Sequence, residues 1–557
     1  MRCLMRSREL RAFFGVLFAL LVTLPASMSG QSVRQVGRSQ SGMVSAAHPL
    51  ATDAGVRMLE LGGNAADAAV AAGFAIAVVE PTMNSIGGRN QILVRTRDGD
   101  FHGIDGTTQA PWNYDEATAP RADYGYAVIG VPGALAGLLK LHDEHGSLPL
   151  ATVMAPAIEY AQHGFRVLPA DARRQASGLS QAREFPGTVA AYYKGNGTLH
   201  AAGELLVQPA YANTLRAIAA GGRDVFYVGA IAEKMAADLS AHGSAVTLQA
   251  LNDYVAENSR IVRGSYRVYD LIGTDVPAAG VLAIQALHIM ENFEPSSMSE
   301  AEWFAITGQA LRMASGELGV LGTDTAAARA TSKAYATQLA SEVLAPAQVP
   351  AELHSPIPVN EDRGDLYGGH TTHLSTADAD GMFVALTQTL GPNMGSKVVT
   401  PDLGFLYAST LGGYLSRGMG PGARARSNIC PFIVMKDGEV VLVLGAAGGG
   451  MIPPAVVHAI TRVIDFGMSL PEALAEPRVA QGRGGFSAET SPGIGWTPAQ
   501  LNEMRALGLE INATPRAGAF GRVHGIQYDA VTQTWTGAAD PDWEGSARGP
   551  RTARGGN

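Results

Sequence analysis

The stretch Gly368-Gly-His-Thr-Thr-His-Leu-Ser375 decides how the rest of the chain is interpreted. It places Thr371 deep inside a polypeptide of 557 residues, where a threonine gains a free amine only if the chain is cut before it. A freed terminal threonine carries its own base, because an α-amino group titrates near neutrality and can take the hydroxyl proton. Thr371 is therefore a candidate nucleophile for amide hydrolysis or acyl transfer. The alternative, a strand filled by β-branched residues after a Gly-Gly turn, stays open on this stretch alone.

A set of segments in a fixed order, several of them rich in glycine, surrounds this stretch. They lie at 60–70, 81–88, 130–137, 150–164, 226–229, 387–390, 427–434, 444–450 and 538–541. Together with the Thr-Thr-His motif they resemble the γ-glutamyltransferase family of N-terminal-nucleophile hydrolases, and the resemblance runs through residues 40–545. It implies an α/β fold, the four-layer α-β-β-α sandwich of the N-terminal-nucleophile hydrolases.

The resemblance also implies roles for particular residues. The first threonine of the family's Thr-Thr-His motif is both cleavage point and nucleophile, which gives these roles to Thr371 and makes His370–Thr371 the cleaved bond. Thr389 matches a second threonine, whose hydroxyl helps to activate the nucleophile. Gly448 and Gly449 match the turn whose backbone N–H groups hold the oxyanion of the tetrahedral intermediate. Cleavage would leave a large subunit, 31–370, and a small subunit, 371–557, paired as a heterodimer.

The expected substrate pocket departs from the family pattern. A γ-glutamyl donor carries an α-carboxylate and an α-ammonium, which call for a guanidinium and a carboxylate. Ser427 and Asn428 stand where the family has paired serines, but the family's arginine has no counterpart, its Asp-Asp pair aligns with Gly412-Gly413, and its asparagine after the second threonine is Gly391. Arg89 is a candidate replacement cation for an acidic acyl group. A surface arginine at a strand start is the alternative for Arg89.

Three functions remain open on the sequence. The first is a γ-glutamyltransferase or glutathione hydrolase that acts on a small amide or peptide, with transfer to water or an amine. The second is a self-processed amidase or acylase for another acyl group, favoured by Gly412-Gly413 and the missing arginine. The third is an inactive exported binding protein, against which the intact Thr371, Thr389, Gly448 and Gly449 argue.

Other chemistries fit the sequence poorly. A phosphate loop would need Gly-Lys-Ser/Thr after the glycines of 444–450, where the chain has Met451-Ile-Pro-Pro454. His370 and His373 would point to opposite faces of a strand, so a shared metal ion is not expected, and a structural hydrogen bond is the preferred interpretation of His373. Cys430 begins an apolar strand and is interpreted as a packed small side chain. We expect no cofactor and no metal.

Composition and the N-terminal sequence indicate the class of protein and its cellular location. A hydrophobic fraction of 46% and a charged fraction of 16% suit one large buried globule, and a net charge of −9 favours neither nucleic acid nor an anionic membrane as partner. Residues 1–30 read as an export signal, with four arginines followed by an apolar run over 12–26. This predicts a periplasmic or secreted protein without stable membrane association once the signal is removed; a retained anchor is the alternative.

Local patterns predict the main elements. Helices are expected over 52–61, 65–79, 454–466 and 498–507, and helical patterns dominate 134–336. Strands are expected near 260–272 and over 371–378, 382–390, 432–435 and 440–444, with a final hairpin around 526–537. Residues 341–365 carry four prolines and little periodicity, which predicts an exposed loop before the candidate cleavage bond.

Overall fold

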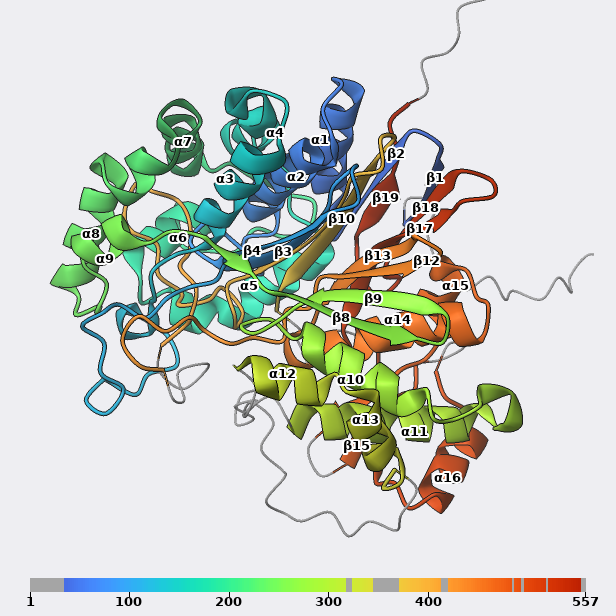
Figure 1. Cartoon of the computed structure of the whole chain (residues 1–557). Coiled ribbons are helices and arrows are strands. Elements are labelled where there is room, and N and C mark those ends of the chain that lie inside the picture. The colour runs from blue at the N-terminus through green and yellow to red at the C-terminus, as the bar shows by residue number, and fades with distance from the viewer. Residues whose placement is uncertain are drawn as a thin grey trace, which may run out of the picture. The chain divides into compact units, whose positions relative to one another are not determined.

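Two antiparallel sheets stack face to face in the computed structural model, and helices cover the outer face of each (Figure 1). The structure describes residues 35–316, 323–343, 370–411, 419–482, 485–491, 495–516 and 519–551. The predicted export signal and most of the predicted loop at 341–365 lie outside these residues. The expected α-β-β-α sandwich is confirmed.

The first sheet holds the candidate nucleophile. Its seven strands follow the order β19-β2-β10-β11-β3-β4-β7. Their bounds are Ser546–Arg548 for β19, Gly42–Ala46 for β2, Thr372–Asp378 for β10, Phe383–Thr389 for β11, Arg89–Arg95 for β3, Phe101–Gly106 for β4 and Glu257–Ser259 for β7. Every residue of β10 and β11 is buried, because one face of these strands packs on helices and the other on the second sheet.

The second sheet supplies the candidate oxyanion turn. Its seven strands follow the order β1-β18-β17-β13-β12-β9-β8. Their bounds are Val36–Ser39 for β1, Thr534–Ala539 for β18, Arg522–Asp529 for β17, Glu439–Ala447 for β13, Phe432–Lys436 for β12, Tyr269–Thr274 for β9 and Ile261–Tyr266 for β8. The predicted strands near 260–272 and the last hairpin are therefore confirmed. Asp437 and Gly438 both have positive φ, of 53° and 84°, which closes the tight β12–β13 hairpin.

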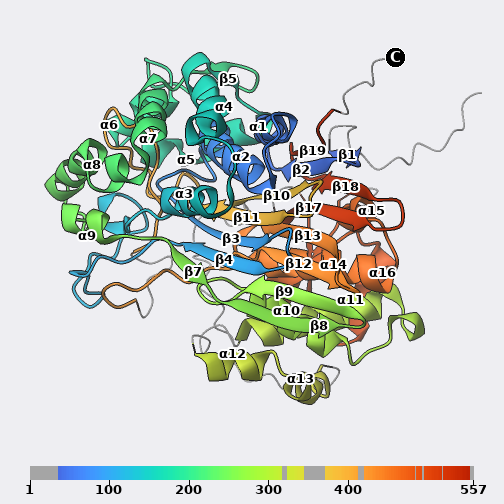
Figure 2. The same cartoon turned by 45° about the horizontal axis from the view of Figure 1, so that its top comes forward.

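Helices from the N-terminal half of the chain cover the outer face of the first sheet (Figure 2). Helices α1, α2 and α3 pack on its strands, α4 packs on α2, and α7 packs on α4. The helices of this half are α1 Pro49–Glu60, α2 Ala65–Val79, α3 Ala134–His145, α4 Leu150–His163, α5 Pro169–Ala182, α6 Pro186–Tyr192, α7 Pro209–Tyr227, α8 Ala230–Ala241 and α9 Leu248–Asp253, with a small sheet of β5 Phe165–Arg166 and β6 Leu205–Leu206. Asn64 caps the start of α2 and forms a capping box with Asp67, and α2 has the predicted bounds of 65–79.

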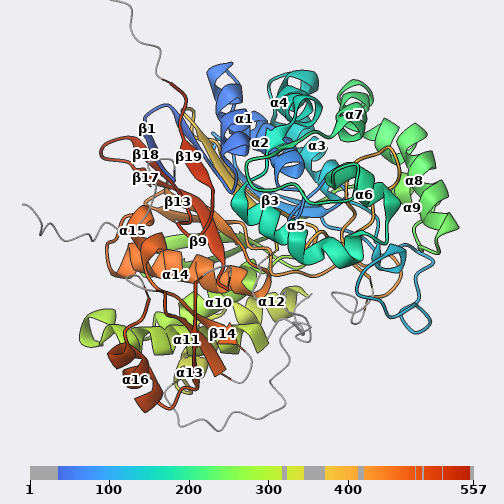
Figure 3. The same ribbon diagram turned by 180° about the vertical axis from the view of Figure 1, so that it is seen from behind.

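The other outer layer packs on the second sheet. Helix α10 covers β8 and β9, α14 covers β13 and β17, and α11 lies on α10. The helices on this side are α10 Gly280–Met290, α11 Glu300–Gly316, α12 Asp324–Ala330, α13 Lys333–Ala340, α14 Ile452–Asp465, α15 Leu470–Ala475 and α16 Pro498–Ala506. Seen from behind, α16 and a small sheet of β14 Val479–Gly482, β15 Gly485–Glu489 and β16 Ile511–Thr514 lie beside α11 (Figure 3). No helix in the described part of the chain is long and apolar enough to cross a membrane.

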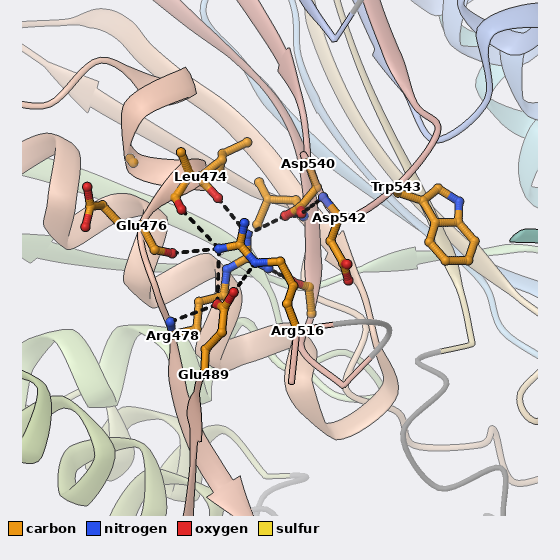
Figure 4. Close-up of polar contacts among 12 residues, drawn as sticks. Leu474, Glu476, Arg478, Glu489, Arg516, Asp540, Asp542 and Trp543 are labelled. Carbon is orange, nitrogen blue, oxygen red and sulfur yellow. Dashed lines mark hydrogen bonds and ion pairs between the residues drawn. The ribbon is translucent and has the colours of Figure 1, made fainter. Parts of the chain in front are cut away.

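A buried ionic network fastens this small sheet to the C-terminal turn (Figure 4). Arg478 Nη2 lies 2.6 Å from Asp540 Oδ2, and Arg516 pairs with Glu489. Asp540 also accepts backbone N–H bonds from Val523 at 3.1 Å and from Asp542 at 3.0 Å. Burial alone would raise the pKa of Asp540, but Arg478 and Arg516 outweigh it and hold the pKa below its usual value.

One buried histidine makes the stability of the fold depend on pH. His48 begins α1, where its Nδ1 accepts the Leu50 N–H at 3.1 Å, and burial lowers its pKa to about 3. The unfolded chain binds this proton below about pH 6.5, so His48 costs stability as the pH falls from there towards 3. His48→Asn keeps the helix cap but removes the titrating group. We expect the unfolding free energy of the variant minus that of its parent to be about 3 kcal/mol larger at pH 4.5 than at pH 8.

Urea unfolding at the two pH values, in a chain that also carries Thr371→Ala so that both proteins stay in one piece, measures this difference. A constant gap between the two proteins from pH 8 to pH 4.5 would show that His48 is not held neutral in the folded state.

Candidate active site

The structure brings the two candidate catalytic threonines together. Thr371 immediately precedes β10, and Thr389 ends β11; Thr372 pairs with Gln388, so the two threonines meet at the same end of neighbouring strands. The Thr371 hydroxyl donates to Thr389 Oγ1 at 3.0 Å, and Thr389 Oγ1 also accepts the Gly391 N–H at 2.9 Å. Both threonines are buried, so a solvent-facing Thr389 is excluded. The Thr389 hydroxyl is thereby fixed beside Thr371 Oγ1.

The backbone at Thr371 is strained. Its φ of 146° lies in a region that β-branched residues avoid, because Cβ and the backbone clash there. Such a conformation costs on the order of 1–3 kcal/mol and persists only where the surrounding fold imposes it. This torsion describes rotation about the N–Cα bond of Thr371, so the strain lies directly next to the candidate cleavage bond.

The second sheet ends in the expected glycine turn. Gly448 and Gly449 have φ of 143° and 55°, and a short 3₁₀ turn, Gly449–Met451, leads directly into α14. A Cβ at Gly448 would lie 2.8 Å from Gly521 Cα, so no other residue fits there without displacing the backbone. Backbone N–H groups at such a turn, next to a helix N-terminus, can hold a developing negative charge.

The two candidate substrate residues approach this turn to different degrees. Asn428 is half-buried, and its Nδ2 lies 3.9 Å from the point where a Cβ of Gly450 would stand. Ser427 is buried, and its backbone N–H donates to Pro277 O at 2.8 Å. Asn428 therefore borders the glycine turn, whereas the contacts of Ser427 fix the backbone that leads to it.

The glycine turn and Thr371 lie at the same end of the stacked sheets. The His373 ring packs directly on Gly445 of β13, where even one added carbon would overlap it. Ala447, the last residue of β13, pairs with Arg522, and the Arg522 charge contributes to the lowered pKa of His370. His373 is two residues after Thr371, and Gly445 is three residues before Gly448, so the start of β10 lies next to the end of β13 that carries the turn.

Both histidines beside the threonines are uncharged at neutral pH. Burial first, and then the nearby cations Arg174, Lys397 and Arg522, holds the pKa of His370 well below its usual value. Burial and then His524 do the same for His373, whose Nδ1 and Nε2 lie 2.7 Å from Thr387 Oγ1 and 3.1 Å from Ser375 Oγ. The structural hydrogen bond predicted for His373 is confirmed.

Arg89 lies inside the protein, beside Thr389. Only 1% of it is exposed, so the interpretation as a surface arginine is wrong. Arg89 pairs with Thr389 across β3 and β11, and residues directly opposite in a sheet share a face. Its Nη1 donates to Ser409 O at 3.2 Å and to Thr108 Oγ1 at 3.4 Å. Gly412-Gly413, the other departure from the family pattern, lies outside the described residues.

Two further sequence interpretations concern metal and thiol chemistry. Cys430 is buried with its pKa raised to about 12 by burial, so the thiol is a packed side chain as expected. In the residues that the structure describes, no three histidine, cysteine or carboxylate side chains gather in a way that could hold a metal ion.

A charged cluster near His370 escaped the sequence analysis. It consists of Glu80, Arg174, Arg522 and Trp543, contributed by four distant segments. No spacing in the sequence links these positions, and only the tertiary fold brings them together. Glu80 lies just before the glycine-rich segment 81–88, which was the nearest available signal.

Comparison with known proteins identifies the family of this chain. The model of the gamma-glutamyltranspeptidase family matches residues 51–549. The chain belongs to this family. Gamma-glutamyltranspeptidase relatives include both hydrolases and acylases, so the protein is an enzyme that cleaves or transfers acyl groups.

Three proteins similar to this chain illustrate the range of the family. The glutathione hydrolase proenzyme of Escherichia coli (strain K12) is 31% identical over 484 residues, 79% of this chain and 81% of the relative. The acylase ACY 1 proenzyme of Pseudomonas sp. (strain SE83) is 32% identical over 532 residues, 89% of this chain and 91% of the relative. The crystal structure of cephalosporin acylase from Bacillus halodurans superposes with a TM-score of 0.83 at 26% identity, covering 95% of this chain and 99% of that one.

Proposed function

We propose that this protein is a self-processing amidase that uses Thr371 as an N-terminal nucleophile and acts on an acyl group that ends in a carboxylate, with γ-glutamyl as the first candidate. The observation that carries the proposal is the 3.0 Å contact between Thr371 Oγ1 and Thr389 Oγ1 at a strained backbone, next to a glycine turn. An inactive binding protein has no need for strain at a buried threonine.

Self-cleavage would be an intramolecular acyl shift. Thr371 Oγ1 attacks the carbonyl carbon of His370, the C–N bond breaks, and the amine of Thr371 leaves with a proton, which produces an ester. Water then hydrolyses the ester to the His370 carboxylate and the free Thr371 hydroxyl. Breaking the bond removes the φ torsion of 146°, so the stored strain favours the shift. The "proenzyme" names of both curated relatives fit this step.

Turnover would reuse the same oxygen. The freed α-amino group takes the Thr371 hydroxyl proton as Oγ1 attacks the substrate carbonyl, and it passes that proton to the leaving amine. Backbone N–H groups at Gly448 and Gly449 would hold the oxyanion, and Thr389 would fix the orientation of Oγ1. Water or an amine would then take the acyl group from the ester.

Arg89 would hold the carboxylate of the acyl group. A buried guanidinium on the same face as Thr389 matches a carboxylate a few carbons from the reacting carbonyl. Ser427 and Asn428 would contribute further polar contacts, and Asn428 borders the glycine turn.

A second candidate is an amidase whose acyl group lacks the α-amino group. It is favoured by Gly412-Gly413, which offer no carboxylate for an ammonium, and by the acylase relatives. The two candidates are separated by paired p-nitroanilides, because glutaryl and γ-glutamyl acyl groups differ only in the α-amino group. Higher kcat/KM for the glutaryl compound supports the second candidate, and higher kcat/KM for the γ-glutamyl compound supports the first.

Arg89→Met tests the carboxylate contact common to both candidates. We expect the variant to raise KM at least about 10-fold for the better of these two substrates, which is equivalent to one lost charge-assisted hydrogen bond. The KM for the uncharged pentanoyl p-nitroanilide should change little. Arg95→Met on the same strand is the control, because Arg95 lies at the far end of β3 and donates to Gly381 O. An equal loss on charged and uncharged substrates would remove Arg89 from the pocket.

The working form would be a heterodimer of 31–370 and 371–557, held together by strands β2 and β3 of the large fragment on either side of β10–β11 of the small one. We propose export to the periplasm or the exterior from the arginine-rich, apolar start of the chain.

A further inference from the structure

Two buried arginines share one aromatic side chain next to the candidate cleavage bond. Arg174 of α5 and Arg522 of β17 place their Cζ atoms 3.6 Å and 3.9 Å from the ring centroid of Trp543. Arg174 is 9% exposed and Arg522 is 1% exposed. The indole face partly offsets the cost of bringing two like charges together, but it offers neither guanidinium a hydrogen-bond acceptor.

Arg174 has donors to spare. Neither its Nη1 nor its Nη2 makes a hydrogen bond or an ion pair with any residue that the structure describes. A buried guanidinium in this state is costly, since its N–H groups have lost water without gaining an acceptor. Its backbone is fixed all the same: Asn393 Nδ2 donates to Arg174 O at 2.8 Å.

The three carboxylates whose charges act on Arg174 accept hydrogen bonds from other groups, whereas Asp542 and Asp540 act on Arg522. Asp171 accepts from Thr82 Oγ1 at 2.5 Å and from Gln175 Nε2 at 2.7 Å. Glu80 accepts from Trp543 Nε1 at 3.3 Å, and Glu544 accepts from the Ala170 N–H. These acids leave the Arg174 fork open, yet their charges would oppose an anion carrying two charges. A planar anion with a single charge suits the site best.

The position of the pair points to its role. The charges of Arg174 and Arg522 both act on His370, and Arg522 pairs with the strand end that carries the glycine turn. Burial, followed by the Arg522 charge, lowers the pKa of Arg174 to about 9, so it is still a cation at neutral pH. We propose that Arg174 and Arg522, stacked on Trp543, form a carboxylate-binding subsite beside Thr371 that is separate from Arg89.

This inference rests on the proposed function, which offers two sources of a carboxylate at this place. Self-cleavage creates one on His370, the residue whose pKa the charges of both arginines lower. The amine part of a substrate amide brings another whenever the leaving group is an amino acid or carries an acid. The chemistry of recognition is the same for both, a guanidinium fork against two carboxylate oxygens.

The first experiment asks whether the site binds a carboxylate at all. In the uncut Thr371→Ala chain, where Arg174 lacks an acceptor, potassium acetate is expected to raise the unfolding temperature by about 2 °C over potassium chloride at equal ionic strength. Arg174→Met should abolish this shift, Arg174→Lys should keep part of it, and Arg173→Met, an exposed neighbour on the same helix, should leave it intact. Equal shifts in Arg174→Met and Arg173→Met would overturn the proposal.

The second experiment identifies which carboxylate occupies the subsite in the cut enzyme. It compares two substrates whose leaving groups differ by one carboxylate, p-nitroaniline and 3-carboxy-4-nitroaniline. If the leaving group occupies the site, Arg174→Met lowers kcat/KM at least about 10-fold for the acidic substrate only. If His370 occupies it, the two substrates respond alike and acetate stabilises only the uncut chain. A wild-type chain that neither cuts itself nor hydrolyses substrate refutes the proposed function. The effect of acetate on the unfolding temperature still tests the carboxylate subsite in that case.

Discussion

Replacing Thr371 by alanine is expected to leave the chain in one piece and to abolish amide turnover. Both processes use the same oxygen in the proposed chemistry, first on the His370 carbonyl and then on the substrate, so no partial activity is expected above about one thousandth of the wild-type rate. The fold should persist, because the substitution removes only a hydroxyl and a methyl group from a strained position. Denaturing gel electrophoresis and p-nitroaniline release report the two losses.

A matched control separates this loss from damage to the strand. Thr376 lies on the same strand, and its hydroxyl donates to Ala65 O at 2.7 Å on the helix side of the sheet. Thr376→Val should cut and turn over like the parent. If an uncut Thr371→Ala chain still hydrolysed substrate, a residue other than Thr371 would be the nucleophile for turnover.

Replacing Asp540 by asparagine is expected to cost about 3–5 kcal/mol of unfolding free energy. Asp540 is fully buried against Arg478, which is itself 3% exposed at its side chain, and the amide would leave that guanidinium charged and uncompensated. The turn that presents Trp543 should loosen as well, because the Asp540 carboxylate accepts the Asp542 backbone N–H at 3.0 Å. Urea unfolding of the Thr371→Ala chain with and without Asp540→Asn measures the difference.

Glu510 supplies the control for that substitution. It is exposed next to β16, so Glu510→Gln removes the same charge from the same small sheet without uncovering a buried partner, and the expected change is below about 0.5 kcal/mol. Similar losses in both variants would show that general charge, rather than the Arg478–Asp540 pair, sets the stability of this region.

Much of the fold follows from local signals in the sequence. Strands β10 to β13 and helices α2, α14 and α16 come within a few residues of their predicted bounds, because β-branched runs, Asp-Gly turns and helix caps are local features. The difference at α1 has a local cause too: it begins three residues early, at Pro49, since the His48 side chain caps it. Histidine is not a residue that sequence rules expect in that role.

The candidate site divides into a part that sequence can predict and a part that it cannot. Thr371, Thr389 and the two glycines were found because motif and order mark them. Arg89 could be named but not placed, since only the sheet register puts it opposite Thr389 inside the protein. The arginine pair around Trp543 was missed because stacking of residues from three distant segments leaves no periodic trace in the sequence.

The central claim is that the chain cuts itself before Thr371, and the mass of the purified protein tests it most directly. After incubation of the wild-type chain, we expect two fragments whose intact masses place the new N-terminus at Thr371, together with release of p-nitroaniline from glutaryl or γ-glutamyl p-nitroanilide. A single uncut chain with full turnover, or fragments that begin at any other residue, would contradict the account.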